Sequence, residues 1–477
     1  MRSVHRKPAA FFWSAVELIH HPLFAFAYYP FHLEYERFVD YRRAMRIPRL
    51  LSIPLILIVI FLPLGGHVSA DESLVTLRSG IDSGAKAVEK DVIAWRRQFH
   101  HNPELSNREF KTAERVAAHL TALGMQVQTE VAHTGVIGLL EGGRPGPVVA
   151  LRADMDALPV TEETGLPFAS TVRSEYEGQD VGVMHACGHD MHTAILMGVA
   201  TVLSGMRDEL PGTVKFIFQP AEEGAPRDEE GGADMMVAEG ALKNPEPSAI
   251  FGLHVIPGWD VGEIAFRPGG MMASSDRLVI TVHGQQTHGA KPWLGVDPIV
   301  VSAQIINALQ TVVSRQSNVT LAPAVVTIGS IHGGTRFNII PDDVEMRGTI
   351  RTFDESMRAD ILESVRRIVA STAESAGATA EVSIFDRNPV TYNDPDLTAK
   401  MTPTLQRVVG RDKAVETLPQ TWAEDFAFYQ QEIPGLYIYL GVRTPGAAPE
   451  SFPTNHSPHF IVDEDVIIVI KRDFMGG

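Results

Sequence analysis

The stretch PVVALRADMD, residues 147–156, joins a short apolar run to two acidic residues. An apolar run followed by acidic or histidine residues also occurs in VKFIFQPAEE, residues 214–223, and in AIFGLH, residues 249–254. Short apolar runs of this kind, with a fourth at Leu436–Leu440, are typical of strands buried in a sheet. Helical patterns such as Thr193–Met206 lie between them, and this alternation predicts an α/β layered domain.

Polar side chains follow three of these apolar runs. They are Asp154 and Asp156, then Glu222 and Glu223, and finally His254. Sites in open α/β sheets form at the carboxyl ends of the strands. We therefore expect carboxylates and an imidazole to meet at one edge of the predicted sheet.

Residues 273–385 follow a different pattern. Strands and helices are predicted in the order βαββαβ, at Leu278–Val282, Asp297–Arg315, Val325–Ile331, Val344–Arg351, Glu355–Ala376 and Ala380–Ile384. That order is typical of a ferredoxin-like unit. We therefore predict a first domain formed by residues 71–272 and 386–477, interrupted by an inserted α+β domain.

The first 70 residues differ from the rest of the chain. The apolar run Leu50–Leu64 follows several arginines and precedes small residues that end at Ala70, a pattern typical of a secretory signal peptide. Because Met45 has the usual spacing for its start, we expect a signal peptide at 45–70 and an extension from start-codon choice at 1–44. The run of about 15 residues is short for a membrane span of ~20, although an uncleaved anchor is the alternative. A secreted or periplasmic protein is expected.

Composition narrows the class of protein. The 477 residues are 44% hydrophobic, which is enough for two domains with cores of their own. A net charge of −17 argues against a nucleic-acid-binding protein. A single cysteine excludes an internal disulfide framework.

That cysteine lies in MHACGHDMH, Met184–His192. Cys187 and His189 are two positions apart, so their side chains can converge in an extended or turn segment. Taken alone, Cys187 is a nucleophile, a soft metal ligand or a small buried hydrophobe, and these readings stay open at this point.

Acidic and histidine residues elsewhere extend the set. Glu222 and Glu223 are neighbours that point in different directions, so one can bind a metal while the other stays free as a general base. His254 and His456 add imidazoles, and Cys187 adds a thiolate. Such a set suffices for two metal ions, which can hold a bridging water and polarise a carbonyl group.

Nine stretches from about Trp95 to Phe460 identify a family resemblance. They are WRRQFHHNPELS, LRADMDALPVTEETGLPFAS, MHACGHDMHTAILMG, FQPAEEGA, FGLHV, THGAKPWLGVDP, RFNIIPDDVEMRGTIRTFD, WAEDFAFY and NHSPHF. In these stretches, and in their order, the sequence resembles the metal-dependent amidohydrolase branch of the aminoacylase and carboxypeptidase superfamily. This branch includes hippurate hydrolase and the plant hydrolases of indoleacetyl-amino acids. The resemblance implies a zinc-exopeptidase-like catalytic domain with an inserted ferredoxin-like lid or dimerisation domain.

The resemblance also implies roles for single residues. Two divalent ions (Zn, Mn, Co or Ni) would be held by five ligands, namely Cys187, His189, Glu223, His254 and His456. Glu222 would be the general base, which takes a proton from the bridging water and passes it to the leaving amine. Asp156 would be a carboxylate outside the ligand set that orients one of the ligands.

Residues of the inserted domain have implied roles as well. His288 matches a histidine that in relatives reaches across a dimer to the substrate carbonyl as an oxyanion stabiliser, so a homodimer through the inserted domain is expected. Asn338 and Arg351 match groups that hold the substrate carboxylate. Trp293 stands where many relatives have a histidine, and we expect it to pack.

Four further features are interpreted from the same comparison of motifs. His100 is expected to be structural and tied to the sheet, and a direct catalytic role for His192 is the less favoured reading. The loop Gly224–Gly232 is long and is a candidate border of the substrate entrance. After Asp465 the chain lacks the amphipathic closing helix that the family resemblance implies, and a frameshift or a truncation would explain this ending.

The sequence thus predicts a hydrolase of N-acyl-amino acids or small peptides, which cleaves an amide next to a free carboxylate. Two alternatives stay open. One is a thiol hydrolase with Cys187 as nucleophile and His189 as its base. The other is a non-catalytic metal-dependent binding protein, against which Glu222 argues because a pure binder needs no uncoordinated base.

Overall fold

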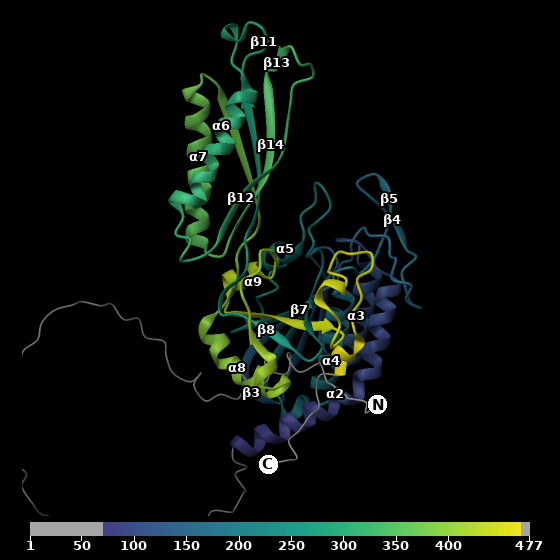
Figure 1. Cartoon of the computed structure of the whole chain (residues 1–477). Coiled ribbons are helices and arrows are strands. Elements are labelled where there is room, and N and C mark those ends of the chain that lie inside the picture. Colours follow the sequence, from purple (N-terminus) through teal and green to yellow (C-terminus); the bar gives the residue numbers. More distant parts are fainter. Residues whose placement is uncertain (1–69, 469–477) are drawn as a thin grey trace, which may run out of the picture.

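The computed structural model describes residues 70–468. The expected extension at 1–44, the expected signal peptide apart from Ala70, and the tail at 469–477 lie outside the described residues. Within 70–468, no helix combines the length and the apolar character needed to cross a membrane. Figure 1 shows two parts, a larger one around a broad sheet and a smaller one above it.

The larger part is built on an eight-stranded sheet. In spatial order the strands are β1 (Gln126–Val131), β2 (Gly135–Glu141), β6 (Pro211–Gln219), β3 (Arg144–Asp154), β7 (Ile250–Asp260), β18 (Gly435–Arg443), β8 (Ile264–Phe266) and β17 (Ala414–Glu416). The central strands β6, β3, β7 and β18 run parallel. All four apolar runs predicted as buried strands lie in these central strands and are buried, apart from the half-buried Val148.

Helices cover both faces of this sheet. One face carries α2 (Ala70–His101), α3 (Phe110–Ala122), α4 (His189–Ser204) and α8 (Pro395–Val409); the other carries α5 (Gly232–Ala238) and α9 (Ala427–Glu432). Neighbouring residues of a strand point to opposite faces, so Leu151 packs in the first core and Ala150 in the second. The α/β layers predicted from the sequence are confirmed.

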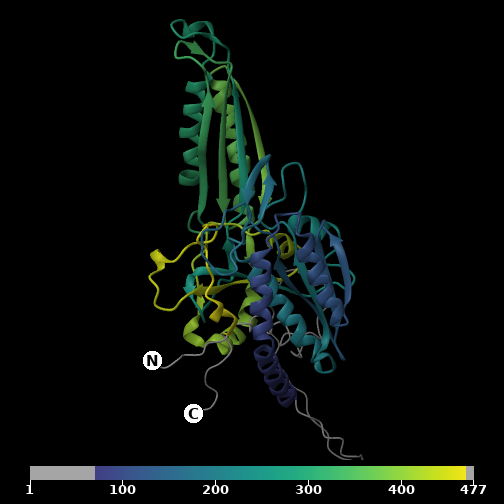
Figure 2. The same cartoon turned by 90° about the vertical axis from the view of Figure 1, so that its right-hand side faces the viewer.

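The smaller part is the inserted domain. It contains β10 (Ser275–His283), α6 (Pro298–Thr311), β12 (Ala324–Gly333), β14 (Asp343–Thr352), α7 (Glu355–Ser375) and β15 (Thr379–Asn388). The strands form an antiparallel sheet in the order β12-β14-β10-β15, and α6 and α7 pack on one face around a separate core (Figure 2). This arrangement confirms the ferredoxin-like insertion. The chain enters and leaves through adjacent strands, since Ser275 pairs with Asn388.

Short strand pairs complete the architecture. They are β4 (Arg173–Tyr176) with β5 (Gln179–Gly182), β9 (Gly269–Met272) with β16 (Thr391–Asn393), and β11 (Thr287–His288) with β13 (Ile339–Ile340). The pair β11 and β13 forms the far tip of the inserted domain (Figure 1). The helix expected at Asp297–Arg315 is α6 followed by a π-helical turn at Val312–Gln316, with Asp297 as its N-cap.

One strand differs from its sequence pattern. The apolar run before His254 suggested that the strand ends there, but β7 continues to Asp260. Beyond Gly252 its pairing with β3 stops, whereas its pairing with β18 runs on past His254. His254 therefore projects from within a strand rather than from a loop after it.

Candidate metal centre

Cys187 and His189 are placed by a turn just before α4. Gly188 has a φ of +97°, a conformation that favours glycine. A Cβ atom at this position would also lie 2.3 Å from Cγ2 of Val255. The turn brings Cys187 and His189 to the same side as the ends of the central strands, and His189 becomes the first residue of α4.

The loop that carries Glu222 and Glu223 is held in place through its backbone amides. The amide of Ala221 donates to Oε1 of Glu109 at 3.0 Å, and the amide of Glu223 donates to Oδ2 of Asp156 at 3.1 Å. Because the loop after β6 is fixed at both points, the carboxylates of Glu222 and Glu223 have defined positions at the strand edge.

The C-terminal loop adds the last histidine. The amide of His456 donates to the carbonyl oxygen of Ala186 at 2.8 Å, and Asn455 Nδ2 donates to the carbonyl oxygen of Cys187 at 3.0 Å. These bonds tie the loop to the turn that carries Cys187. Asn455 is a positioning residue that sequence reasoning missed, although it stands beside His456 in the quoted motif.

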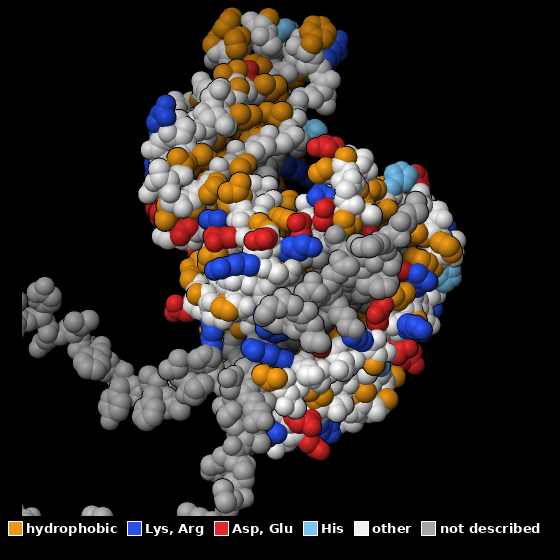
Figure 3. Space-filling model, turned by 60° about the horizontal axis from the view of Figure 1, so that its bottom comes forward, with side chains coloured by type: hydrophobic (Ala, Val, Ile, Leu, Met, Phe, Trp, Pro, Cys, Tyr) orange, Lys and Arg blue, Asp and Glu red, His pale blue; other side chains and the backbone are white. Residues whose placement is uncertain are grey.

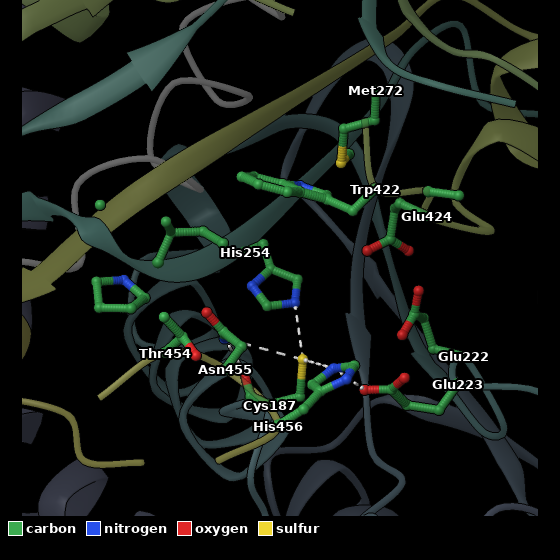
Figure 4. A pocket seen from close by; sticks show the side chains of 14 residues that line it. Cys187, Glu222, Glu223, His254, Met272, Trp422, Glu424, Thr454, Asn455 and His456 are labelled. Carbon is green, nitrogen blue, oxygen red and sulfur yellow. Dashed lines mark hydrogen bonds and ion pairs between the residues drawn. The ribbon is translucent and has the colours of Figure 1, made fainter. Parts of the chain in front are cut away.

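The donor atoms of the five expected ligands converge. Sγ of Cys187 lies 3.3 Å from Nε2 of His254 and 3.3 Å from Nε2 of His456, and the latter atom lies 3.0 Å from Oε1 of Glu223. Nε2 of His189 lies 3.7 Å from Oε2 of Glu222. Figure 4 shows most of these side chains pointing into one space, with Glu222 and Glu223 on the wall opposite Cys187.

These atoms form overlapping groups of three within 4.8 Å. The groups are Cys187 with His189 and His254, Cys187 with Glu223 and His456, and His189 with Glu222 and Glu223. The first two share the cysteine, so the arrangement fits two neighbouring ions. A thiolate, imidazoles and carboxylates are ligands that zinc and related transition metals accept.

The ring orientations of the histidines support metal binding. Nδ1 of His254 donates to the carbonyl oxygen of Val255 at 2.9 Å, and Nδ1 of His189 donates to Oδ1 of Asp156 at 3.1 Å. Both Nε2 atoms therefore face the cluster, where they can present a lone pair. Within residues 70–468, Nε2 of His189 is buried without a hydrogen-bond partner.

Electrostatics at the cluster favour added positive charge. Burial lowers the pKa of His189, but Asp154 and Asp156 outweigh burial and raise it to about 10. Burial raises the pKa of the Cys187 thiol well above its usual range, and Glu223 and Glu222 raise it further. A bound divalent cation would supply positive charge beside these carboxylates and would stabilise the thiolate.

A further group of possible ligands is already satisfied. The amide of Val255 donates to Nε2 of His192 at 2.9 Å, so Nδ1 of His192 carries the proton that it shares with Oδ1 of Asp154 at 2.6 Å. His192 therefore has no free lone pair for a metal or for a substrate. Its place in the fold is structural, as the favoured sequence interpretation had it.

Comparison with known proteins identifies the family. The sequence profile of Peptidase family M20/M25/M40 matches residues 150–471. The chain belongs to this family. Three similar proteins span nearly its whole folded length, as follows.

The M20 chain is 41% identical to thermostable carboxypeptidase 2 of Saccharolobus solfataricus over 389 residues, 81% of this chain and 94% of the relative. It is 40% identical to N-acetylcysteine deacetylase of Bacillus subtilis over 390 residues, 82% and 96% of the two chains. The crystal structure of a dinuclear metal binding peptidase from the M20 family, also from B. subtilis, matches with a TM-score of 0.66 at 37% identity and covers 80% of this chain and 95% of that one. The M20 chain is a metal-dependent hydrolase of amide bonds.

A cavity of about 430 Å³ opens beside the cluster of this M20 hydrolase. Its walls include Ile256, Pro257, Met272, Trp422 and Glu424, besides Cys187, Glu222, Glu223, His254 and His456. The loop Gly224–Gly232, expected at the substrate entrance, does not line the cavity. Its Glu229 instead binds Asn107 and Arg108 beside α3, and a place of the loop at the entrance stays a prediction.

Beneath the cavity, Arg152 is the centre of a buried ionic network. Its guanidinium contacts Asp154 at 2.6 Å, Asp425 at 2.9 Å and Glu424 at 3.0 Å, and its side chain is fully buried. Glu424 also accepts a hydrogen bond from the hydroxyl of Tyr437 at 2.6 Å. Sequence reasoning missed this network; its one signal was an arginine inside the apolar run of β3.

His100 lies away from the sheet. Its ring bridges Oδ2 of Asp190 at 2.9 Å and Oε1 of Glu162 at 3.1 Å, and Arg96 shares the same oxygen of Asp190. The ring is fully buried. A structural role agrees with the expectation, but the contacts run to α4 and to the loop of Glu162 rather than to the sheet.

The implied residues of the inserted domain lie at its two ends. His288 and Asn338 belong to the tip, where the amide of Gly289 donates to the carbonyl oxygen of Asn338 (Figure 1). Arg351 lies near the other end, in β14 beside Ser274. Within one chain, the tip residues and the metal cluster are therefore far apart, and Asn338 and Arg351 do not meet.

Trp293 corrects one expectation. It was predicted to pack, yet 76% of it is exposed in the turn next to β11. Leu294 and Phe337 are exposed at the same tip, and Figure 3 shows hydrophobic side chains gathered there. Within residues 70–468, no surface of the chain covers these side chains at the tip.

Proposed function

We propose that this M20 hydrolase cleaves the amide bond of N-acyl-amino acids or small peptides next to a free carboxylate. Glu222 carries the proposal. Its carboxylate stands beside the donor cluster, yet within residues 70–468 no hydrogen bond engages it. A carboxylate kept free at this point suits a general base. The relatives named carboxypeptidase and deacetylase support the same class of substrate.

Two divalent ions held by Cys187, His189, Glu223, His254 and His456 would, when bound, lower the pKa of a shared water and polarise the substrate carbonyl. The side chains of the chain do the rest. Glu222 accepts a proton from the attacking water and returns it to the amide nitrogen as the C–N bond breaks, which yields a carboxylic acid and an amine. Asp156 keeps the ring of His189 in place through Nδ1.

The ions that the proposal admits are Zn, Mn, Co and Ni, because this mixed donor set does not choose sharply among them. The similar B. subtilis peptidase of the same family binds a dinuclear metal centre, and this likeness supports the proposal of two ions per chain. The substrate is a small molecule, and the acidic composition supports the proposal that nucleic acid is not a partner.

Metal removal separates this proposal from the thiol-hydrolase alternative. A nucleophilic cysteine needs a lowered pKa, whereas burial and the neighbouring carboxylates raise the pKa of Cys187. We expect a chelator to abolish hydrolysis of an N-acyl-amino acid and added metal to restore it. A thiol alkylator should leave the metal-loaded enzyme active. Activity that survives chelation but not alkylation would establish the thiol mechanism instead.

We propose further that the enzyme works as a homodimer through the inserted domain. The ring of His288 supports this: its Nδ1 accepts a hydrogen bond from the amide of Ala290 at 2.9 Å, so Nε2 carries the proton and points outward. Such an N–H can stabilise an oxyanion only in a site other than that of its own chain. Asn338, at the same tip, would act in the partner's site too. Arg351 would bind the substrate carboxylate in the site of its own chain.

Mixed dimers test this arrangement. His288→Ala and Glu222→Gln chains should each be nearly inactive alone, while unfolding and refolding them together should recover about one working site per heterodimer. The matched control is Trp293→Ala mixed with Glu222→Gln, in which His288 is intact in both chains. An absence of recovery, with dimers present by light scattering, would place His288 outside the partner's site.

We also propose export from the cytoplasm, secreted or periplasmic. The basic, apolar and small-residue order of residues 45–70 supports it, with an uncleaved anchor as the alternative.

A further inference from the structure

Trp422 is an aromatic residue left open to the cavity. Although large apolar side chains are mostly buried in this fold, 44% of Trp422 is exposed, and the exposed part lines the cavity. Figure 4 shows its ring between Met272 on one side and the donor cluster on the other. A substrate that reaches the cluster therefore passes this ring.

The ring of Trp422 is held in one orientation. The indole Nε1 donates to the hydroxyl of Tyr439 at 3.0 Å. The backbone carbonyl oxygen of Trp422 accepts a hydrogen bond from the amide of Ala273 at 3.0 Å. Tyr439 is buried and stacks on Trp259, with ring centroids 5.3 Å apart and planes 17° apart. A ring fixed in advance binds at a lower entropic cost than a mobile one.

The charges of the cavity decide which half of a substrate faces this ring. The charged side chains in its walls besides histidine are Glu222, Glu223 and Glu424, and among the described wall residues none is Lys or Arg. An N-acyl-amino acid carries its carboxylate on the amine side of the scissile bond. The apolar walls beside Trp422 offer the carboxylate of that half no basic side chain to pair with, so the uncharged acyl half fits against Trp422.

We propose that Trp422 is a specificity-determining residue whose ring stacks on a planar aromatic acyl group. The inference rests on the proposed hydrolysis of N-acyl-amino acids. Ile256, Pro257 and Met272 supply apolar walls around the same space, which suits an arylacyl group and disfavours an anionic one.

Three substrates with the same amine test the proposal: acetylglycine, cyclohexylacetylglycine and phenylacetylglycine. In the metal-loaded wild-type enzyme, kcat/KM should rise in that order. Trp422→Leu should lower the ratio of phenylacetyl to cyclohexylacetyl turnover about threefold to tenfold, the range expected for the loss of one aromatic contact. Trp422→Phe keeps an aromatic face and should retain most of the ratio. The size-matched cyclohexyl group separates stacking from simple apolar burial.

Two controls keep the result unambiguous. Leu418→Ala changes a 77% exposed residue of the same segment that does not line the cavity, and should leave all ratios unchanged. Turnover of acetylglycine and metal content report the integrity of each variant. Should Trp422→Leu fail to fold, Tyr439→Phe, which removes only the hydroxyl that holds the indole, should give an intermediate fall in the ratio.

Each contrary outcome has a separate meaning. An unchanged ratio in Trp422→Leu, with acetylglycine turnover preserved, overturns the inference and leaves the proposed function intact. In acetylphenylalanine the aromatic ring belongs to the amino-acid half. If Trp422→Leu lowers kcat/KM for this substrate instead, the assignment of the acyl half to Trp422 is overturned. A wild-type enzyme that hydrolyses none of these amides contradicts the proposed function itself.

Discussion

Glu222→Gln is expected to lower kcat for an N-acyl-amino acid by about 10²–10⁴-fold, the usual contribution of a positioned general base. Glutamine has nearly the same shape, but its amide cannot accept the proton of the attacking water or return it to the leaving nitrogen. Because Glu222 stands beside the donor cluster without being one of the five proposed ligands, two metals per chain should still bind. Steady-state kinetics and metal analysis of the same sample measure both effects.

Glu223→Gln is the matched comparison for this variant. It changes the neighbouring carboxylate, whose Oε1 lies 3.0 Å from Nε2 of His456, so its metal content should fall together with its activity. Unchanged activity in Glu222→Gln would mean that the base is assigned wrongly. Full metal binding without any hydrolysis in the wild type would support the non-catalytic alternative.

Arg152→Met is expected to lower the free energy of unfolding by about 3–5 kcal/mol, the usual cost of removing one partner from a buried ionic group. The substitution leaves Asp154, Glu424 and Asp425 buried beside one another without the guanidinium that neutralises them. Urea-induced unfolding of the metal-loaded protein measures the change. Hydrolysis should fall as well, because Asp154 orients His192 and Glu424 lines the cavity.

Arg347→Met is the control for the loss of an arginine. Arg347 is an exposed residue of the inserted sheet that pairs with Glu345, and a pair of that kind contributes at most about 1 kcal/mol. An Arg152→Met protein that unfolds within about 1 kcal/mol of the wild type would show that the three carboxylates take up protons at little cost.

The elements of the fold were predictable from local patterns. The central strands read as short apolar runs because both faces of a parallel sheet are covered by helices, as α4 and α9 show here. The βαββαβ order of the insertion could also be predicted from the sequence pattern. The carboxylates expected at one edge of the sheet follow β3 and β6, which do end there, whereas the full ligand set was implied by the family resemblance.

Contacts distant in sequence were harder to predict. In the sequence, Arg152 looks like an ordinary strand residue. Only the fold brings Glu424 and Asp425, which lie far along the chain, into contact with it. Trp293 was expected to pack, yet the sequence pattern of a loop does not show what surrounds the tip of that loop. Trp422 stood in a quoted motif, but only the fold shows that its ring faces a cavity.

The pairing of β7 with β18 has a consequence for the order in which the protein matures. The two strands lie side by side in the middle of the sheet, and the whole inserted domain is synthesised between them. During translation, the edge of β7 stays without its neighbour until the ribosome has made β18, and His456 emerges later still. The nascent chain therefore lacks a complete donor set until His456 has been made.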